Sequence, residues 1–189
     1  MSIELYRAQG HIKMPWKNGR GVTEQMYIWP RGATLEKGDF DLRVSSALVS
    51  SGGPFSNFEG FTRFLALLSG PKMILNVEGQ QKVIDGPSPF CFEGEWAVTC
   101  EEPTSTQRDL NLFVRRTSLL PHVEVAREPV KFLPRFLSLV IALEGTATVD
   151  LEGQSHNLAP LDLLVIEGAY PLATLTPGGL SWLVTLQKR

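Results

Sequence analysis

Glycine and proline divide this chain into many short runs that favour strands, and this feature limits its fold more than any other. The 17 glycines and 13 prolines are spread over 189 residues, and the runs between them are rich in valine, isoleucine, leucine, phenylalanine and threonine. Such runs are typical of all-β sandwiches and barrels. We predict an all-β protein. The predicted strands span residues 3–6, 22–29, 40–49, 61–68, 73–77, 90–92, 97–100, 110–115, 123–127, 137–144, 146–151, 161–166 and 181–186.

The composition argues against several classes of function. The net charge is -2 at pH 7, and the lysines and arginines are scattered, so we predict no nucleic-acid partner. No segment approaches the roughly 18 apolar residues of a membrane-spanning helix, and no apolar run follows a basic start at the N-terminus. We therefore expect no membrane partner and a cytoplasmic protein. Cys91 and Cys100 are expected to be reduced thiols buried in strands.

Two parts of the chain resemble each other. Residues 65–94 match residues 140–168, with Gly70 against Gly145 and two later Glu-Gly pairs aligned after a single deletion. Hairpin turns favour glycine in any case, but anchors in register with apolar runs between them favour a duplicated β unit. We predict a bicupin made of two double-stranded β-helix (jelly-roll) barrels. The first barrel would span 1–118 and hold a ligand pocket, and the second would span 119–189 as a structural or interface lobe.

The run from Phe40 to Val49 alternates with period two, as strands do. Its even positions are mostly apolar, while its odd positions include Arg43 and Ser45. An arginine in a barrel mouth is costly unless it is paired, and its planar fork suits a carboxylate. Two interpretations stay open at this point. Arg43 either binds a ligand or is held by an internal salt bridge to Asp41, Asp109 or Glu24.

The residues needed for two common kinds of catalytic site are missing. The three histidines, His11, His122 and His156, do not form the His-x-His pair that the usual cupin metal site requires. No Gly-x-Ser-x-Gly elbow is present either. We predict no metal, no cofactor and no assigned catalytic residue.

Polar residues suited to ligand binding are concentrated in the first repeat, whereas residues 137–143 of the second are almost wholly apolar. Some lie in a Pro-Trp-Lys-Asn-Gly loop, where the tryptophan can wall a pocket and its neighbours offer donors. Phe55 and Phe58 are expected in the core rather than in the pocket wall. The predicted ligand-binding residues are Trp16, Lys17, Asn18, Thr23, Glu24, Arg43, Ser45, Arg63, Asp109 and Asn111.

Five blocks of this sequence resemble the HutD/Ves family of bicupins. They are P-W-K-N-G-R-G-V-T-E at 15–24, F-D-L-R-V-S-S-A-L-V at 40–49, the run at 53–70, P-F-C-F-E-G at 89–94 and R-D-L-N-L-F-V-R-R at 108–116. The resemblance implies a metal-free double β-barrel, often encoded with the histidine-utilisation pathway, whose polar motif positions are the ten residues just named. This chain departs from the family pattern at Arg20, Leu42, Glu59 and Phe113, where the family usually has Gly, Trp, Pro and Met.

The resemblance also implies a role. It suggests metal-independent binding of a small anionic metabolite, such as the N-substituted glutamates formylglutamate or formiminoglutamate, with an accessory or regulatory effect on a pathway. Two alternatives remain. One is a metal-free isomerase or hydrolase that acts on a small acid with Glu24 or Asp109 as general base. The other is an interaction module whose apolar second barrel forms a homodimer.

Overall fold

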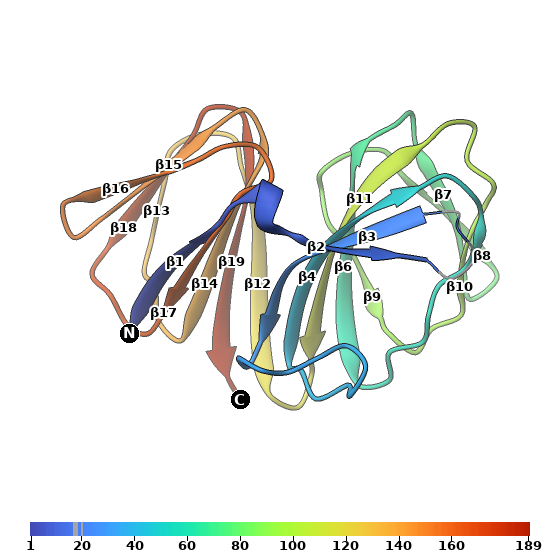
Figure 1. Ribbon diagram of the computed structural model, residues 1–189, viewed down its shortest axis with the longest axis horizontal. Coiled ribbons are helices and arrows are strands. Elements are labelled where there is room, and N and C mark those ends of the chain that lie inside the picture. Colours follow the sequence, from blue (N-terminus) through green and yellow to red (C-terminus); the bar gives the residue numbers. More distant parts are fainter. Residues whose placement is uncertain (17–18, 20) are drawn as a thin grey trace. The chain divides into compact units, whose positions relative to one another are not determined.

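The computed structural model describes residues 1–16, 19 and 21–189, and it is all-β. The described residues form nineteen strands and one short 3-10 helix, Ala8–Gly10 (Figure 1). All strand pairs are antiparallel. The chain divides into two compact units: a central unit of Ile12–Ser118, and a terminal unit of Met1–His11 with Leu119–Arg189. No helix in the described part of the chain is long and apolar enough to cross a membrane.

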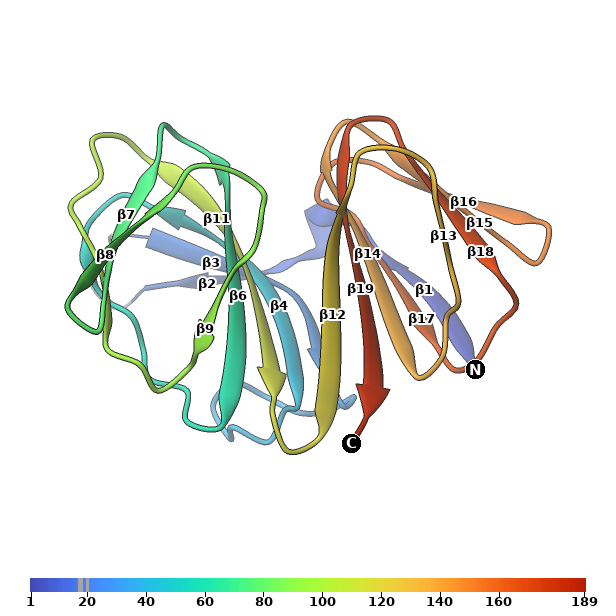
Figure 2. The ribbon, with the colours of Figure 1, turned by 180° about the vertical axis from the view of Figure 1, so that it is seen from behind.

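The central unit contains two sheets (Figure 2). The first has the order β2-β3-β4-β11-β6-β9 and the second the order β5-β10-β7-β8. The strands are β2 (Ile12–Pro15), β3 (Gly21–Trp29), β4 (Leu42–Val49), β5 (Gly53–Pro54), β6 (Phe61–Ser69), β7 (Met73–Val77), β8 (Gln80–Ile84), β9 (Phe90–Glu93), β10 (Val98–Cys100) and β11 (Gln107–Arg115).

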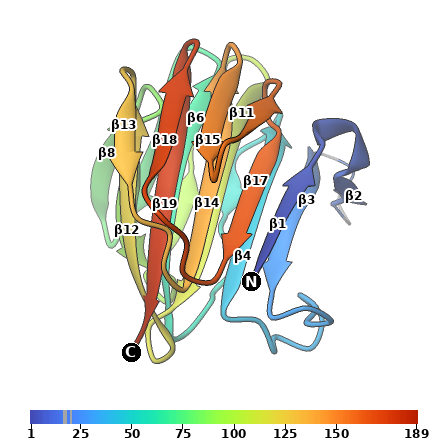
Figure 3. The ribbon, with the colours of Figure 1, turned by 90° about the vertical axis from the view of Figure 1, so that its left-hand side faces the viewer.

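The terminal unit also contains two sheets, in the orders β1-β17-β14-β19-β12 and β13-β18-β15-β16. Figure 3 shows the second of these facing the viewer. The strands are β1 (Ser2–Tyr6), β12 (Leu119–Ala126), β13 (Val130–Phe132), β14 (Leu137–Glu144), β15 (Ala147–Leu151), β16 (Gln154–Leu158), β17 (Leu163–Glu167), β18 (Ala173–Pro177) and β19 (Leu180–Lys188).

The first eleven residues belong to the terminal unit and not to the central unit, which differs from the predicted division into 1–118 and 119–189. Strand β1 pairs with β17, and Ile3 and Leu5 pack against the apolar core of the terminal unit. The physical reason is burial of these two side chains on an otherwise open sheet edge. The other end of the central unit lies at Ser118, next to the predicted boundary.

The two units share one strand order. The order β4-β11-β6-β9 in the central unit corresponds to β12-β19-β14-β17 in the terminal unit, and β5-β10-β7-β8 corresponds to β13-β18-β15-β16. The pairing of β6 with β11 and that of β14 with β19 each contain a register shift near the same end, at Arg108/Asp109 and at Ala142/Glu144. The first matched Glu-Gly pair of each repeat forms the β7–β8 and the β15–β16 turn, in which Glu78 and Glu152 have positive φ.

Strand β4 runs through the middle of the first sheet and is buried on both faces. Leu42 and Val44 have no exposed surface, and Arg43 and Ser45 on the other face are also buried. Cross-strand pairing brings Arg43, Phe113 and Arg63 into one row over β4, β11 and β6. This row positions the functional site.

Candidate functional site

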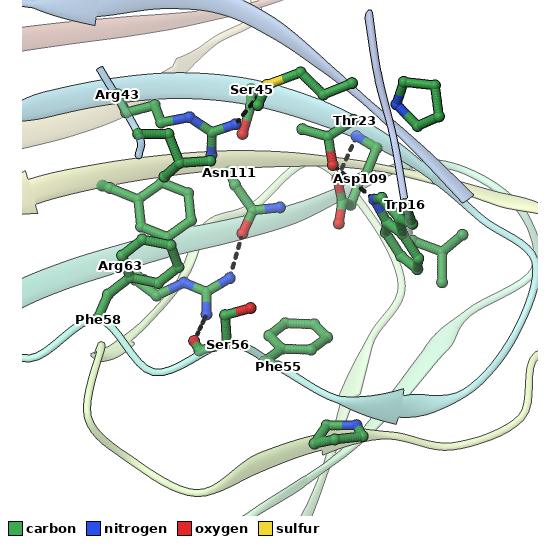
Figure 4. A pocket seen from close by; sticks show the side chains of 17 residues that line it. Trp16, Thr23, Arg43, Ser45, Phe55, Ser56, Phe58, Arg63, Asp109 and Asn111 are labelled. Atoms are coloured by element: carbon green, nitrogen blue, oxygen red, sulfur yellow. Dashed lines mark hydrogen bonds between the residues drawn. The ribbon is translucent and has the colours of Figure 1, made fainter. Parts of the chain in front are cut away.

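A cavity of about 470 Å³ opens within the central unit (Figure 4). Its polar groups come mainly from β4, β6 and β11, and its apolar wall comes from β2, β5 and the segments that follow β3 and β5. The lining residues are Met14, Pro15, Trp16, Thr23, Leu35, Arg43, Ser45, Ala47, Val49, Pro54, Phe55, Ser56, Phe58, Arg63, Asp109, Asn111 and Phe113.

Arg43 is buried in the cavity wall without a carboxylate partner among the described residues. Its Nε donates to Gln25 Oε1 at 3.0 Å, its Nη2 lies 4.0 Å from Met14 Sδ, and only 4% of the residue is exposed. Two of the acids that could have held it are bound elsewhere, since Asp41 pairs with Arg115 and Glu24 with Arg108. Burial lowers the pKa of Arg43 to about 10, against the opposing effect of Asp109, so the guanidinium stays charged at neutral pH.

Arg63 lies on the same side of the cavity, enclosed by aromatic rings. Its guanidinium carbon is 4.6 Å from the centre of the Phe113 ring, 4.9 Å from those of Phe55 and Phe92, and 5.9 Å from that of Phe58. Cation–π contacts of this kind stabilise a desolvated arginine. The Nη2 group donates to Asn111 Oδ1 at 2.9 Å, and Nη1 points to the Ser56 carbonyl at 3.5 Å (Figure 4).

Asp109 is the acid of the cavity and is 3% exposed. Its Oδ1 accepts the Ala47 backbone N–H at 2.7 Å. Burial raises the pKa of Asp109 to about 6, although the Ala47 hydrogen bond, the Asn111 side chain and the charges of Arg63 and Arg108 act in the opposite direction. The ionisation of this group therefore changes near neutral pH.

The structure brings seven of the ten predicted site residues together around the cavity. Trp16 Nε1 donates to Thr23 Oγ1 at 2.9 Å, and both side chains line the wall with Ser45. Lys17 and Asn18, like Arg20, lie outside the described residues. The seven residues that line the cavity are Trp16, Thr23, Arg43, Ser45, Arg63, Asp109 and Asn111.

Glu24 is not on the cavity wall, which differs from the prediction that it binds the ligand. Its carboxylate forms an ion pair with Arg108 at 2.8 Å. Successive residues of a strand point to opposite faces. Because Thr23 faces the cavity, its neighbour Glu24 faces away.

Several lining residues were missed by reasoning from the sequence. Phe113, noted only as a departure from the family pattern, covers Arg63 and lies 5.6 Å from Arg43. Its alternation with Asp109 and Asn111 along β11 was the signal that could have revealed it. Phe55 and Phe58 were expected in the core. They are partly buried and pack against core clusters, and they also line the cavity.

The arrangement presents two buried cations and one acid of raised pKa to a space large enough for a small molecule. Such a site can bind an anion through charge-assisted hydrogen bonds. Among the described residues, no three His, Cys, Asp or Glu side chains are grouped closely enough to hold a metal ion.

The fold places this chain among cupin-like all-β proteins. A cupin 2 conserved barrel domain protein from Leptotrichia buccalis superimposes with a TM-score of 0.60 over 89% of both chains, and its 8% identity means that this likeness concerns the fold alone.

A family model described as HutD matches residues 8–181, and the chain therefore belongs to the HutD family. The similarity to a structure of HutD from Pseudomonas fluorescens, obtained in a formate condition, covers all of both chains with a TM-score of 0.86 and 30% identity. An uncharacterised 21.2 kDa protein from the hutC 3′ region of Pseudomonas putida is 37% identical over 58% of this chain, and protein Ves of Citrobacter koseri is 33% identical over 60%. The matches span 57% and 60% of these two curated relatives.

Proposed function

We propose that this protein binds a small carboxylate anion in the cavity of the central unit, without a metal, and that it acts as an accessory or regulatory protein. The observation that carries the proposal is Arg43, a buried guanidinium that lines the cavity and forms no ion pair among the described residues. Its Nη1 has no hydrogen-bond acceptor in the described part of the chain.

The physical argument is one of charge compensation. A charged group removed from water costs free energy unless another group compensates it. Arg63 adds a second positive charge, and the single carboxylate of Asp109 cannot neutralise both arginines. A ligand carboxylate beside Arg43 would restore the balance, because a guanidinium fork and a carboxylate match in geometry.

The relatives indicate which anions to try first. One is a HutD protein whose structure was obtained in a formate condition, and another comes from a hutC region. We therefore propose a ligand related to histidine utilisation, such as an N-substituted glutamate. Formylglutamate and formiminoglutamate carry two carboxylates, and the cavity of about 470 Å³ is within the size range of small-molecule sites.

We also propose that the two units are the barrels of a duplicated jelly-roll bicupin, with the terminal unit as a structural or subunit-contact lobe. The shared strand order and the corresponding register shifts support this origin. A homodimer remains a prediction, which the mass of the protein in solution would test.

A thermal-shift experiment tests the binding proposal. The compounds are formate, succinate, formylglutamate and formiminoglutamate, and each is added to wild type, Arg43→Ala and Arg127→Ala. A ligand at about 100 times its Kd stabilises the folded state by roughly 2.7 kcal/mol, which raises the Tm of a chain of this size by roughly 5 to 10 °C. We expect this shift in wild type and in Arg127→Ala, an exposed control in the terminal unit, and its loss in Arg43→Ala. If no compound shifts the Tm of wild type, the proposal is wrong.

A second function is favoured by one observation, the raised pKa of the Asp109 carboxyl in the cavity. A carboxylate that ionises near neutral pH can act as a general base on a small acid. Glu24 is no longer a candidate for this role, because it faces away from the cavity and pairs with Arg108. The test is incubation of the bound compound with wild type and Asp109→Asn, followed by NMR. Conversion by wild type and not by the variant would establish an enzyme, and an unchanged compound would eliminate this function.

A further inference from the structure

The cavity contains the carboxyl group of Asp109, and the proposed ligand would bring a second carboxylate into the same space. Among the described lining residues, Asp109 is the only Asp or Glu. It lies on β11 between Ala47 of β4 and Leu67 of β6, in the middle of the sheet, and is almost completely buried. Water therefore screens its charge poorly.

The charged and titratable groups around Asp109 come from four strands. Among the described residues they are Arg43 on β4, Arg63 on β6, Arg108 on β11 and the Cys100 thiol on β10. None of the arginines makes an ion pair of 4.0 Å or less with Asp109; Arg108 is bound to Glu24 instead. Burial, with a smaller contribution from the charge of Asp109, raises the pKa of Cys100 to about 11, so this thiol is neutral at physiological pH.

The hydrogen bonds of Asp109 leave one of its oxygens able to carry a proton. Oδ1 accepts the Ala47 N–H at 2.7 Å. Asn111 Oδ1 accepts from Arg63 Nη2 at 2.9 Å, and the Asn111 side chain favours the ionised form of Asp109. A proton on Oδ2 would break none of the Ala47 and Arg63 hydrogen bonds.

Two carboxylates in one poorly solvated cavity do not both remain ionised at low cost. The usual outcome is that one keeps its charge and the pKa of the other rises. The ligand carboxylate has a guanidinium available, Arg43, whereas Asp109 has no ion-pair partner among the described residues. Asp109 is therefore the group that is expected to become neutral.

We propose that a carboxylate ligand enters this cavity together with one proton, which Asp109 takes up, so that its neutral carboxyl group donates a hydrogen bond to the bound anion. The proton comes from solvent and adds to Oδ2, the ligand keeps its charge, and no bond in the ligand changes. Protonated Asp109 is thus a recognition residue, because it favours a ligand group that accepts a hydrogen bond over a positively charged group. This inference rests on the proposed binding function.

The proposed proton uptake predicts that the affinity for the ligand falls as the pH rises. Below about pH 6 the acid already carries its proton, so the affinity is insensitive to pH there. Above pH 6 a proton must be taken up on binding, and Kd rises with pH by up to tenfold per unit. The carboxyl groups of glutamate derivatives have pKa values of roughly 3.5 to 4.3, so the ligand itself does not titrate in this range.

The test is calorimetry with N-formylglutamate as the probe. Binding to wild type is measured at pH 7.5 in phosphate, HEPES and Tris, whose ionisation enthalpies differ, and the slope of the observed enthalpy against buffer enthalpy counts the protons taken up. We expect a slope close to one proton in wild type and in Asp150→Asn, an exposed acid on β15 of the terminal unit. For Asp109→Asn we expect a slope of zero and a Kd that changes by less than about twofold between pH 6 and 8.5, since the amide can still donate to the ligand.

Three results would overturn the inference. Binding to wild type without proton uptake does so on its own, and it leaves the proposed function intact. An unchanged slope in Asp109→Asn would show that another group takes up the proton. No heat and no thermal shift with the probe or with any compound of the panel would reject the proposed function, and the inference with it.

Discussion

At the scale of single residues, the cavity contains buried charged side chains that contribute little to the stability of the fold. Arg63 is enclosed by aromatic rings, and burial lowers its pKa to about 10, with Asp109 acting against this effect and Arg43 adding to it. Its Nε is buried without a hydrogen-bond partner in the described part of the chain. Asp109 is likewise buried with a raised pKa. Such residues destabilise the empty fold and are typical of functional sites.

Asp109→Asn is expected to stabilise the protein at alkaline pH and not at acid pH. The folded-state pKa of about 6 lies above the unfolded value of 3.8, so the native state favours the protonated form. The resulting stability is fully present below pH 4 and is lost as the pH rises through 6. The change is up to about 3 kcal/mol, because each unit of pKa is worth about 1.4 kcal/mol. Asparagine does not titrate and can still accept the Ala47 N–H.

The measurement is urea unfolding of wild type and Asp109→Asn between pH 4.5 and 8. The difference between the two proteins is the relevant quantity, since all other carboxyl groups are common to both. A difference that stays constant over this range would show that Asp109 ionises at an ordinary pKa.

At the scale of elements, the strands that the sequence predicted are mainly those with apolar or alternating runs. Six strands were missed: β2, β5, β8, β13, β16 and β18. Of these, β8 (Gln80–Ile84) and β16 (Gln154–Leu158) are edge strands with mostly exposed or half-buried polar residues. Such strands lack a hydrophobic signal, because their place depends on hydrogen bonds to a neighbouring strand. β8 and β16 line no part of the cavity, whereas β2 and β5 contribute Met14, Pro15 and Pro54 to its apolar wall, which the predicted site therefore lacked.

A close approach of two segments supports the aromatic wall. Gly94 follows β9, donates to the Phe61 carbonyl at 2.7 Å and accepts the Phe58 N–H at 2.9 Å. A Cβ at this position would lie 2.3 Å from the Phe58 carbonyl oxygen, which is backbone and can move only with its segment. The Phe58 ring in turn packs on the Phe113 ring, with centroids 4.8 Å apart. Gly94 therefore controls the cavity wall from outside it.

Gly94→Ala is expected to destabilise the protein by about 1 to 3 kcal/mol, as overpacking does, and to weaken anion binding through displacement of Phe58. Thermal unfolding and titration with formylglutamate measure the two effects. Gly86→Ala is the matched control, since a Cβ there meets nothing within 4 Å and its φ is not positive. Equal stability and affinity in the two variants would contradict this account of the wall.

At the scale of the whole molecule, two units with one strand order differ at the positions that form the site. Counted from the corresponding register shifts, Arg63, Phe113 and Arg43 form one row of the central unit, and Ser138, Thr185 and His122 form the corresponding row of the terminal unit. The place of Asp109 is taken by Ser181. Among the described residues, this row therefore carries two arginines in the central unit and none in the terminal unit.

Hydrogen exchange with and without formylglutamate tests this asymmetry. Amides of β4, β6 and β11 are expected to exchange more slowly in the presence of ligand, because binding stabilises the strands that carry the contacts. The corresponding strands β12, β14 and β19 provide an internal control in the same molecule. Protection centred on those strands instead would place the site in the terminal unit.

The sequence by itself determined the class of fold, the family and the shared face of the polar residues on β4 and on β11. Alternation with period two placed Arg43 with Ser45, and Asp109 with Asn111, on shared faces. Such a period depends only on neighbouring residues, so it can be detected in the sequence. The tertiary structure decided which charges meet. The Ala47 N–H that donates to Asp109 is 62 residues away in the chain. Glu24 forms an ion pair with Arg108, and β1 pairs with β17 of the terminal unit. These contacts depend on pairing between strands that are distant in the sequence and on the loss of water around buried groups. Neither can be derived from neighbouring residues in the sequence.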